Sequence, residues 1–317
     1  MEKDFHYYLT YALAKITGLN NPEVVAYSSQ FVDDNNEGQF SINGEEMPFP
    51  ERLRANGGYY YPIMTQSLSP KSLDPYVQKY VYVPFHFLPG DNNAVIKGVR
   101  NPLSTTPDSA NAKSIISKAL DSDNPYLTGI ALHTFADTWS HQNFSGLREE
   151  WNAVYPWYNV FKSIVPDIGH AEAGHSPDVI SEPWVDYRLA EPWVDYRLGK
   201  NVIDNKERAF YAVREIYGNL QTKTRKGLPW SDVKTILQGI INSDGYDERI
   251  KATSAFLKNS GFGSIPDYSK DDWLDAALDK NGKDVVMKPD FTTTHWYNFH
   301  QAAKIHFANV MDLIKRI

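Results

Sequence analysis

The sequence contains no cysteine among its 317 residues. Disulfide bonds and thiolate metal sites are therefore excluded, and any metal ion must be held by imidazole and carboxylate groups. The sequence also lacks a run of the ~18 consecutive apolar residues that a membrane span needs. We therefore expect no stable membrane insertion.

Basic residues are outnumbered by acidic ones, 32 to 39, which gives a formal net charge of −7. This balance argues against an electrostatic grip on long nucleic acid. A small anionic substrate remains compatible with it, because bound metal ions would reverse the local potential. The opening MEKDFHYYLTYALAK lacks the apolar core of a secretory signal and has Asp4 and His6 where basic residues are expected. We therefore expect a cytoplasmic protein.

The composition is typical of a globular protein, because 42% of the residues are hydrophobic and 14% are aromatic. Apolar residues recur at helical spacing, and the sequence shows neither βαβ units nor runs of alternating strands. It predicts a mainly α fold, a multi-helix bundle that forms one domain over residues 1–317. We expect helices at about 6–18, 22–34, 108–122, 125–143, 150–162, 204–220, 229–242, 246–258, 270–279 and 291–316.

Residues 36–105 interrupt this pattern, since they are rich in glycine, proline, asparagine and tyrosine. They predict a long loop-rich insertion with a short hairpin around YVYVPFHF. Long loops inside a compact domain are usually functional. The aromatic residues of GGYYYP at 57–62 are expected either to line a substrate slot or to pack in the core.

Residues 182–199 are a tandem repeat, with EPWVDYRLA at 182–190 and EPWVDYRLG at 191–199. Nine residues are too few for a solenoid unit. We interpret the repeat as a duplication that lengthens one loop or helix; the alternative is a pair of aromatic–carboxylate–arginine patches near a site. Residues 1–180 are expected to hold the metal site, and residues 181–317 to supply additional helices.

The segment TGIALHTFADTWSHQNFSG at 128–146 carries the most informative spacing. His133, Asp137 and His141 follow one another at intervals of four, which places them on one face of a helix. Three polar groups on an otherwise apolar helix are costly to bury without a partner. A metal ion would satisfy all three, although a His–Asp ion pair alone is the simpler alternative.

The remaining histidines fall into two classes. His6, His86, His170 and His175 lie in short motifs beside carboxylates, glycine or proline: DFHYY, PFHFLPGD and GHAEAGHSPD. The last three histidines lie in a C-terminal amphipathic segment, HWYNFHQAAKIHFANV, with no carboxylate one turn away. For these three we expect ordinary packing at a helix surface or core edge, at His295, His300 and His306.

In their order, these motifs resemble the superfamily of zinc-dependent phospholipase C and single-strand nucleases, an all-helical fold with a trinuclear zinc site. The resemblance covers about residues 4–180. It implies ligands at His6, at Asp33 or Asp34 in SSQFVDDN, at His86, and at His133, Asp137 and His141. It also implies that His170 is a ligand together with Glu172, His175 or Asp178.

Three features depart from the family, and one of them is the gap from Asp137 to His141, which is shorter than in the family's secreted enzymes. The family's mature enzymes begin with a tryptophan whose amine and carbonyl bind one zinc, whereas this sequence has Met1, so that ligand is missing in its usual form. Asp4, two residues before His6, is our candidate for a replacement carboxylate. The final acid does not follow its histidine at the family's spacing of four, since position 174 is glycine.

The resemblance implies a phosphoester hydrolase, phospholipase C-like or nuclease-like, with about three zinc ions or other divalent metals and a small phosphoester substrate. Paired metals acidify a water molecule and bind phosphate oxygens. Asp33 or Asp34 would bridge metals and orient that water. Two alternatives are a different His/Asp phosphohydrolase that prefers manganese or iron and a phosphomonoester, and a non-catalytic helical protein with a degenerate site.

Overall fold

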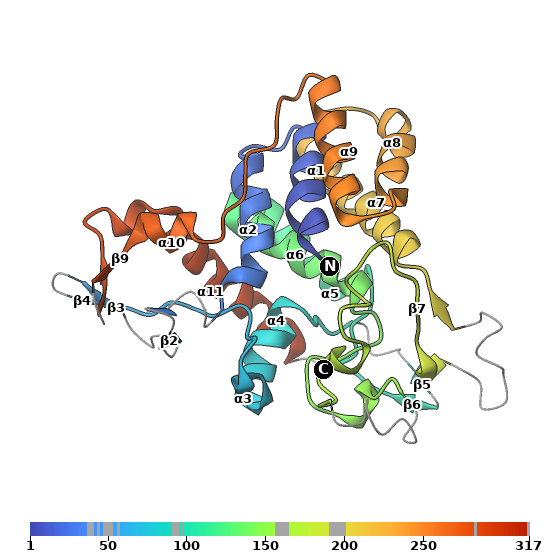
Figure 1. Cartoon of the computed structure of the whole chain (residues 1–317), viewed down its shortest axis with the longest axis horizontal. Helices are drawn as coiled ribbons and strands as arrows, with labels where there is room; N and C mark the ends of the chain where they lie inside the picture. The colour runs from blue at the N-terminus through green and yellow to red at the C-terminus, as the bar shows by residue number, and fades with distance from the viewer. Residues whose placement is uncertain are drawn as a thin grey trace.

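The computed structural model describes residues 1–36, 41–42, 45–46, 53–55, 58–90, 95–96, 98–155, 165–189, 201–281 and 284–315. The fold is mainly helical, as the sequence predicts. Helix α6 (Pro125–Ser140) runs through the middle of the molecule (Figure 1). Four long helices pack against it: α2 (Pro22–Asp34), α5 (Ala110–Asp121), α7 (Asn205–Thr224) and α11 (His295–Ile314).

Helix α6 is buried over its whole circumference, from Leu127 to Thr138. It begins at Asn124, whose Oδ1 accepts the backbone N–H groups of Tyr126 and Leu127 at 3.0 and 3.1 Å. It ends at Ser140, three residues earlier than predicted, although the next N–H still bonds to the Asp137 carbonyl. The polar stripe on this helix is therefore enclosed by other elements.

Gly129 allows α2 to approach α6 at backbone distance. A Cβ at this position would lie 2.3 Å from the carbonyl oxygen of Val25 and 2.6 Å from the Cβ of Ser28. Only glycine fits such a close approach. As a result, the C-terminal end of α2, which carries Asp33, lies beside the middle of α6.

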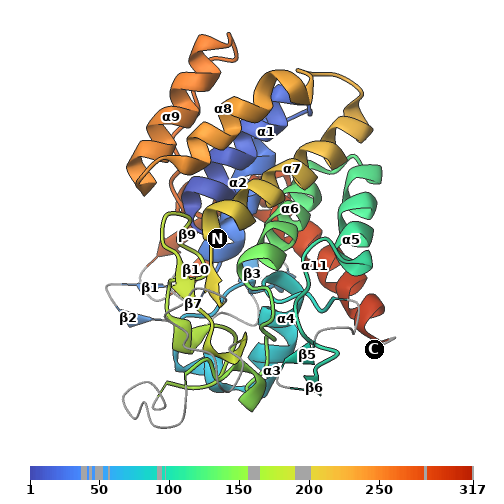
Figure 2. The same ribbon diagram turned by 90° about the vertical axis from the view of Figure 1, so that its right-hand side faces the viewer.

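The N-terminal segment forms a π-helix, η1 (Asp4–Leu9), which continues as α1 (Thr10–Ile16). Helices α8 (Trp230–Asn242) and α9 (Tyr246–Asn259) form a layer at one end of the molecule, and α9 packs against η1 (Figures 1 and 2). No helix of the described part of the chain is long and apolar enough to cross a membrane.

The loop-rich insertion contains more helix than predicted. In place of a hairpin, YVYVPFHF lies in a chain of short helical turns that ends at His86: η3 (Pro70–Leu73), α3 (Pro75–Val77), η4 (Gln78–Tyr82) and α4 (Val83–Phe85). The turns form backbone hydrogen bonds within the segment, including those from the N–H groups of His86 and Phe87 to the Tyr82 carbonyl at 2.9 Å, whereas an isolated two-stranded hairpin is only marginally stable in water.

A small mixed sheet joins this insertion to the C-terminal region in the order β4 (Gly58–Tyr60), β3 (Leu53–Ala55), β10 (Asp284–Met287), β9 (Leu278–Asn281). Strand β3 runs parallel to β10, with Val286 opposite Arg54. Helix α10 (Asp272–Ala277) leads directly into β9, two residues before the predicted end of that helix. Three two-residue pairs complete the described strands: β1 (Ser41–Ile42) with β2 (Glu45–Glu46), β5 (Val95–Ile96) with β6 (Val99–Arg100), and β7 (Trp184–Val185) with β8 (Val202–Ile203).

Of the helix predicted at 150–162, the structure describes residues 150–155. This part contains a single 3-10 turn, at Glu150–Asn152. Residues 156–162 lie outside the described part of the chain. The second copy of the tandem repeat, at 191–199, also lies outside it.

The first copy of the repeat is part of the core. Trp184, Asp186 and Arg188 are all buried. Arg188 donates from Nε and Nη2 to the Asp186 carboxylate at 2.9 and 2.7 Å, and its guanidinium lies 4.0 Å from the ring centroid of Phe144. These contacts make this copy a structural element.

We expect Arg188→Ala to leave the Asp186 carboxylate buried without its counter-charge, a change that lowers the free energy of unfolding by about 3–5 kcal/mol. Urea unfolding of the variant and of the wild type measures this loss. Equal stability of the two proteins would contradict the structural role of the first copy.

Two histidines of α11 are buried in the core, which corrects their expected position at a helix surface or core edge. His306 donates from Nε2 to the Pro84 carbonyl at 2.9 Å, and His300 accepts the Ile63 N–H at 3.1 Å. Burial lowers the pKa of both imidazoles, that of His306 to about 4. Both are neutral packing residues at neutral pH.

This depressed pKa predicts acid sensitivity. The unfolded chain takes up a proton at His306 near pH 6.5, whereas the folded chain does so only near pH 4, so stability falls as the pH drops between these values. The loss amounts to about 3 kcal/mol. Urea unfolding of the metal-free protein should show this extra loss relative to His306→Gln, which cannot titrate. Identical pH dependence in both proteins would contradict the assignment.

Candidate metal centre

A pocket of about 670 Å³ opens onto the polar stripe of α6. Eight of the candidate ligands line it: Asp33, Asp34, His86, Asp137, His141, His170, His175 and Asp178. Its walls are partly apolar and include Leu68, Leu73, Tyr82, Phe87 and Ile168. The aromatic residues of GGYYYP do not contribute to this lining as far as they are described, and Tyr60 instead packs on Phe291 and Tyr297.

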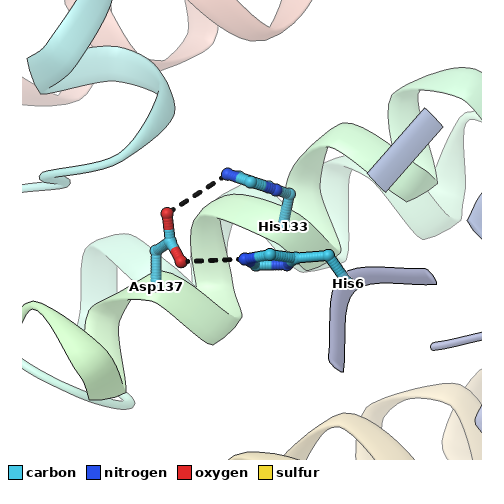
Figure 3. A group of neighbouring side chains, drawn as sticks. All are labelled: His6, His133 and Asp137. Atoms are coloured by element: carbon cyan, nitrogen blue, oxygen red, sulfur yellow. Dashed lines mark hydrogen bonds and ion pairs between the residues drawn. The ribbon is translucent and has the colours of Figure 1, made fainter. Parts of the chain in front are cut away.

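The carboxylate of Asp137 is the centre of the site, and its two oxygens face different partners. Oδ1 lies 3.1 Å from Nε2 of His6 and 2.7 Å from the amino nitrogen of Met1. Oδ2 lies 3.1 Å from Nδ1 of His86 and 3.1 Å from Nε2 of His133. Figure 3 shows the rings of His6, from the N-terminal segment, and His133, from α6, each directed at its own carboxylate oxygen.

Asp33 completes the arrangement on the Oδ2 side. Its Oδ1 lies 3.8 Å from Nδ1 of His86 and 3.7 Å from Nε2 of His133. These two ring nitrogens are themselves 3.2 Å apart. Three residues from α2, the insertion and α6 therefore converge on one point.

A separate group lies where α6 ends. Nε2 of His141 is 3.0 Å from Oδ1 of Asp178, and Nε2 of His170 is 3.2 Å from Oδ2 of the same carboxylate. The two imidazoles stack with their centroids 4.7 Å apart. The sequence left Glu172, His175 and Asp178 open as partners of His170, and the structure brings Asp178 to this group.

Four of the histidines are oriented by backbone carbonyls. A ring nitrogen of each lies 2.8–2.9 Å from a carbonyl oxygen, in the pairs His86–Thr65, His133–Ser29, His141–His86 and His170–Gly174. A neutral imidazole has a single N–H group, so this contact makes the other nitrogen a lone pair. In each case that lone pair faces the carboxylates or another imidazole. Backbone-anchored histidines of this kind are typical of metal ligands.

The lone pairs of these rings and the oxygens of the carboxylates repel one another unless a proton or a cation lies between them. Within each of three groups the candidate atoms lie within 4.8 Å of one another: His6–His133–Asp137, Asp33–His86–His133 and His141–His170–Asp178. Ligands 2.0–2.1 Å from one tetrahedral metal lie roughly 3.4 Å apart. The residues present therefore fit a divalent metal such as zinc.

The charged groups of the site shift one another's pKa values. Burial by itself raises the pKa of Asp137, but the Met1 ammonium and the neighbouring histidines outweigh it and hold that pKa well below its usual range. The same balance depresses the pKa of Asp178. Burial lowers the pKa of His6 and His170. Asp137 and Asp178 are therefore kept ionised beside the neutral imidazoles of His6 and His170, the protonation state in which both kinds of group bind metals. At His141 burial lowers the pKa, but Asp137 and Asp178 outweigh it and raise that pKa above its usual value.

The amino group of Met1 lies in the site. The resemblance to the phospholipase C and nuclease superfamily had implied that its N-terminal ligand is missing here in its usual form. The amino group lies 2.7 Å from Asp137, 3.0 Å from Oδ1 of Asp178 and 3.2 Å from the hydroxyl of Ser140. Burial lowers its pKa, but the surrounding aspartates raise it to about 11. No residue pattern signals this, because every chain has an amino group and only the fold determines where it lies.

Asp4 does not supply the replacement carboxylate. Its side chain is buried and accepts a hydrogen bond from Nε of Arg249 at 2.5 Å. Arg249 lies on α9, so this partner is 245 positions away in the sequence, where local spacing gives no hint of it. The Met1 amine lies where Asp4 was expected to act.

Asp34 lines the same pocket but lies outside the three groups. Its Oδ2 accepts hydrogen bonds from the hydroxyl of Tyr268 at 2.6 Å and from Nε2 of Gln30 at 3.1 Å. Of the two adjacent aspartates, the structure therefore brings Asp33 to the histidines and engages Asp34 with Tyr268.

Glu172 and His175 are also separate from the three groups. Glu172 is buried and accepts the backbone N–H groups of Val154 and Tyr155 at 2.7 and 3.1 Å, a loop-stabilising role. His175 is exposed at the pocket lining. Of the three acids or bases offered by GHAEAGHSPD, only Asp178 lies beside His141 and His170.

A model of a family of unknown function, DUF6765, matches residues 1–314. The chain belongs to this family. No curated protein and no solved structure matches it. The function of this DUF6765 chain is therefore proposed from the distances and contacts of the site.

The buried amino group makes a direct prediction. Two residues added before Met1 displace an ammonium that neutralises buried carboxylates, and removing one partner of a buried charge pair costs about 3–5 kcal/mol. We therefore expect the free energy of unfolding of the metal-free protein to fall by this amount. The same two residues appended after Ile317 are the matched control. Equal stability of both extended proteins would contradict the placement of the amine.

Proposed function

We propose that this chain is a zinc-dependent phosphoester hydrolase of the phospholipase C-like or nuclease-like type, with about three metal ions. The observation that carries the proposal is the set of imidazole lone pairs and carboxylate oxygens that face one another beneath a pocket. Such an arrangement is costly without a cation, and it has the donor atoms that zinc accepts.

The ligands divide into three sets. The Met1 amine, His6 and Oδ1 of Asp137 would hold one ion, and the amine would lose a proton on binding it. Oδ2 of Asp137, with Asp33, His86 and His133, would hold a second. The third would be held by His141, His170 and Asp178. Asp137 would thus bridge the first two ions.

Bound divalent metals would neutralise phosphate charge and acidify a water molecule at the site. Asp33 is suited to accept the proton of the attacking water, because its side chain is 28% exposed at the pocket. Burial raises the pKa of the metal-free carboxyl group to about 7, and a bound cation would lower that pKa, so the role of Asp33 follows from its position at the pocket. Asp33 is therefore our catalytic residue, rather than Asp34.

The pocket supports a small substrate with one phosphoester group. Among the described residues, its lining contains one lysine, Lys3, and no arginine, so this part of the pocket offers little to a polyanion beyond the metal centre. Apolar side chains at its mouth, including Leu68 and Leu73, can contact the organic part of the substrate. This agrees with the negative net charge, which disfavours long nucleic acid.

Elemental analysis of untagged protein purified with excess zinc tests the proposal. We expect about three zinc ions per chain, about two for Asp178→Asn and about one for Asp137→Asn, whose carboxylate serves two sets. His175→Asn, an exposed residue of the same loop, is the matched control and should retain three. The wild type should also hydrolyse a chromogenic phosphodiester in a reaction that a chelator abolishes.

Fewer than two ions in the wild type would contradict the trinuclear centre. A preference for manganese or iron, with a phosphomonoester as substrate, would favour a different His/Asp phosphohydrolase. Unchanged metal content and melting temperature in His133→Ala and Asp137→Ala would identify a degenerate site.

A further inference from the structure

The most deeply buried cation of the described chain outside the metal centre is Arg249, in the first turn of α9. Its side chain is fully buried, and its Nε donates to Oδ2 of Asp4, which is 1% exposed. Nη1 donates to the Ser243 carbonyl at 3.2 Å. The other oxygen of Asp4 accepts the backbone N–H of Phe5 at 3.0 Å.

Stability alone does not explain such a pair. Replacing a buried ion pair by apolar side chains of similar volume is often neutral or stabilising. A hydrogen-bonded pair differs from an apolar contact in direction, because it fixes the orientation of both partners. Arg249 therefore determines how the backbone at Asp4 lies against α9.

The residues on either side of Asp4 belong to the metal centre. Met1 precedes it by three positions and His6 follows it by two, and both face Oδ1 of Asp137. The turn between them is continuous, since the N–H groups of Phe5 and His6 both donate to the Glu2 carbonyl at 3.0 Å. Holding Asp4 thus holds the segment that carries both groups.

The other two ligand sets are carried by different elements. Asp33 and His133 lie on α2 and α6, and His86 is anchored by the Thr65 carbonyl. The set at His141 and Asp178 lies at the end of α6 and in the segment between α6 and β7. Among the described contacts, none of these ligands touches Arg249.

We propose that Arg249 is a positioning residue: through Asp4 it orients the N-terminal turn so that Met1 and His6 meet Oδ1 of Asp137, and it thereby sets the zinc affinity of that one site. The inference rests on the proposed function. It also assigns a role to the C-terminal part of the chain, since α9 shapes a site whose ligands all lie within the first 178 residues.

Zinc binding to the full chain tests this with Asp4→Leu/Arg249→Met, in which an apolar pair replaces the ion pair. Circular dichroism and thermal unfolding establish that the variant folds. We expect two zinc ions to remain and the third to bind at least tenfold more weakly in a competition titration with a chromogenic chelator. Asp186→Leu/Arg188→Met replaces an equally buried Asp–Arg pair by apolar residues, and among the described contacts this pair does not touch η1. It is the matched control and should retain the N-terminal ion.

Second substitutions identify the ion that is lost. In the Asp4→Leu/Arg249→Met background, His6→Ala should remove only the weakly bound ion and leave two tight ones, whereas Asp178→Asn should leave one tight ion. Arg249→Lys keeps the charge but not the planar geometry, so its third ion should bind with intermediate affinity. If the apolar double variant does not fold, Arg249→Lys decides the question by the same titration.

Each outcome bears on one claim. Three ions of wild-type affinity in Asp4→Leu/Arg249→Met, or in Arg249→Lys if only that variant folds, would overturn the positioning role and leave the proposed function intact. Loss of zinc from the His141 set instead of the His6 set would also overturn it. A wild-type protein that binds no zinc would overturn the proposed function and this inference with it.

Discussion

The carboxylate of Asp137 is surrounded by an ammonium group and imidazoles that cannot all form hydrogen bonds with it and with one another at once. It lies in the middle of a helix that is buried on every side, with an ammonium and an imidazole at one oxygen and two imidazoles at the other. A lone buried carboxylate would be protonated or excluded from the core. Here the neighbours keep it ionised, and they come from three separate parts of the chain: the N-terminal segment, the insertion and α6 itself.

The rest of the fold follows from bringing those parts together. Gly129 admits α2 to backbone contact with α6, which delivers Asp33 and the Ser29 carbonyl that orients His133. The short helical turns of the insertion end at His86, where the Thr65 carbonyl orients the ring. Helix α9 holds the N-terminal turn through Arg249. The helices, the insertion and the N-terminal turn therefore together position the imidazoles and carboxylates around Asp137.

Much of this was predictable because it is local. Apolar periodicity predicted most of the long helices, and spacing by four placed His133, Asp137 and His141 on one side of α6. The order of the histidine motifs pointed to the residues that the structure brings together. These signals are properties of neighbouring residues, which a sequence displays directly.

The remainder depends on long-range contacts that spacing does not encode. The roles of Met1, Asp4 and Arg249 depend on where the N-terminal turn meets α9, and the separation of Asp33 from Asp34 depends on Tyr268. Likewise, YVYVPFHF alternates like a strand, yet its tertiary surroundings favour helical turns. Burial of His300 and His306 followed from the packing of α11, not from its amphipathic pattern.

The central claim is that Asp137 is shared between two metal ions. A crystal of the protein grown with zinc, measured on both sides of the zinc absorption edge, tests it most directly. The account predicts three anomalous peaks: one at Oδ1 of Asp137 beside His6 and Met1, one at Oδ2 beside His86 and His133, and one among His141, His170 and Asp178. A single peak at Asp137, or none, would contradict it.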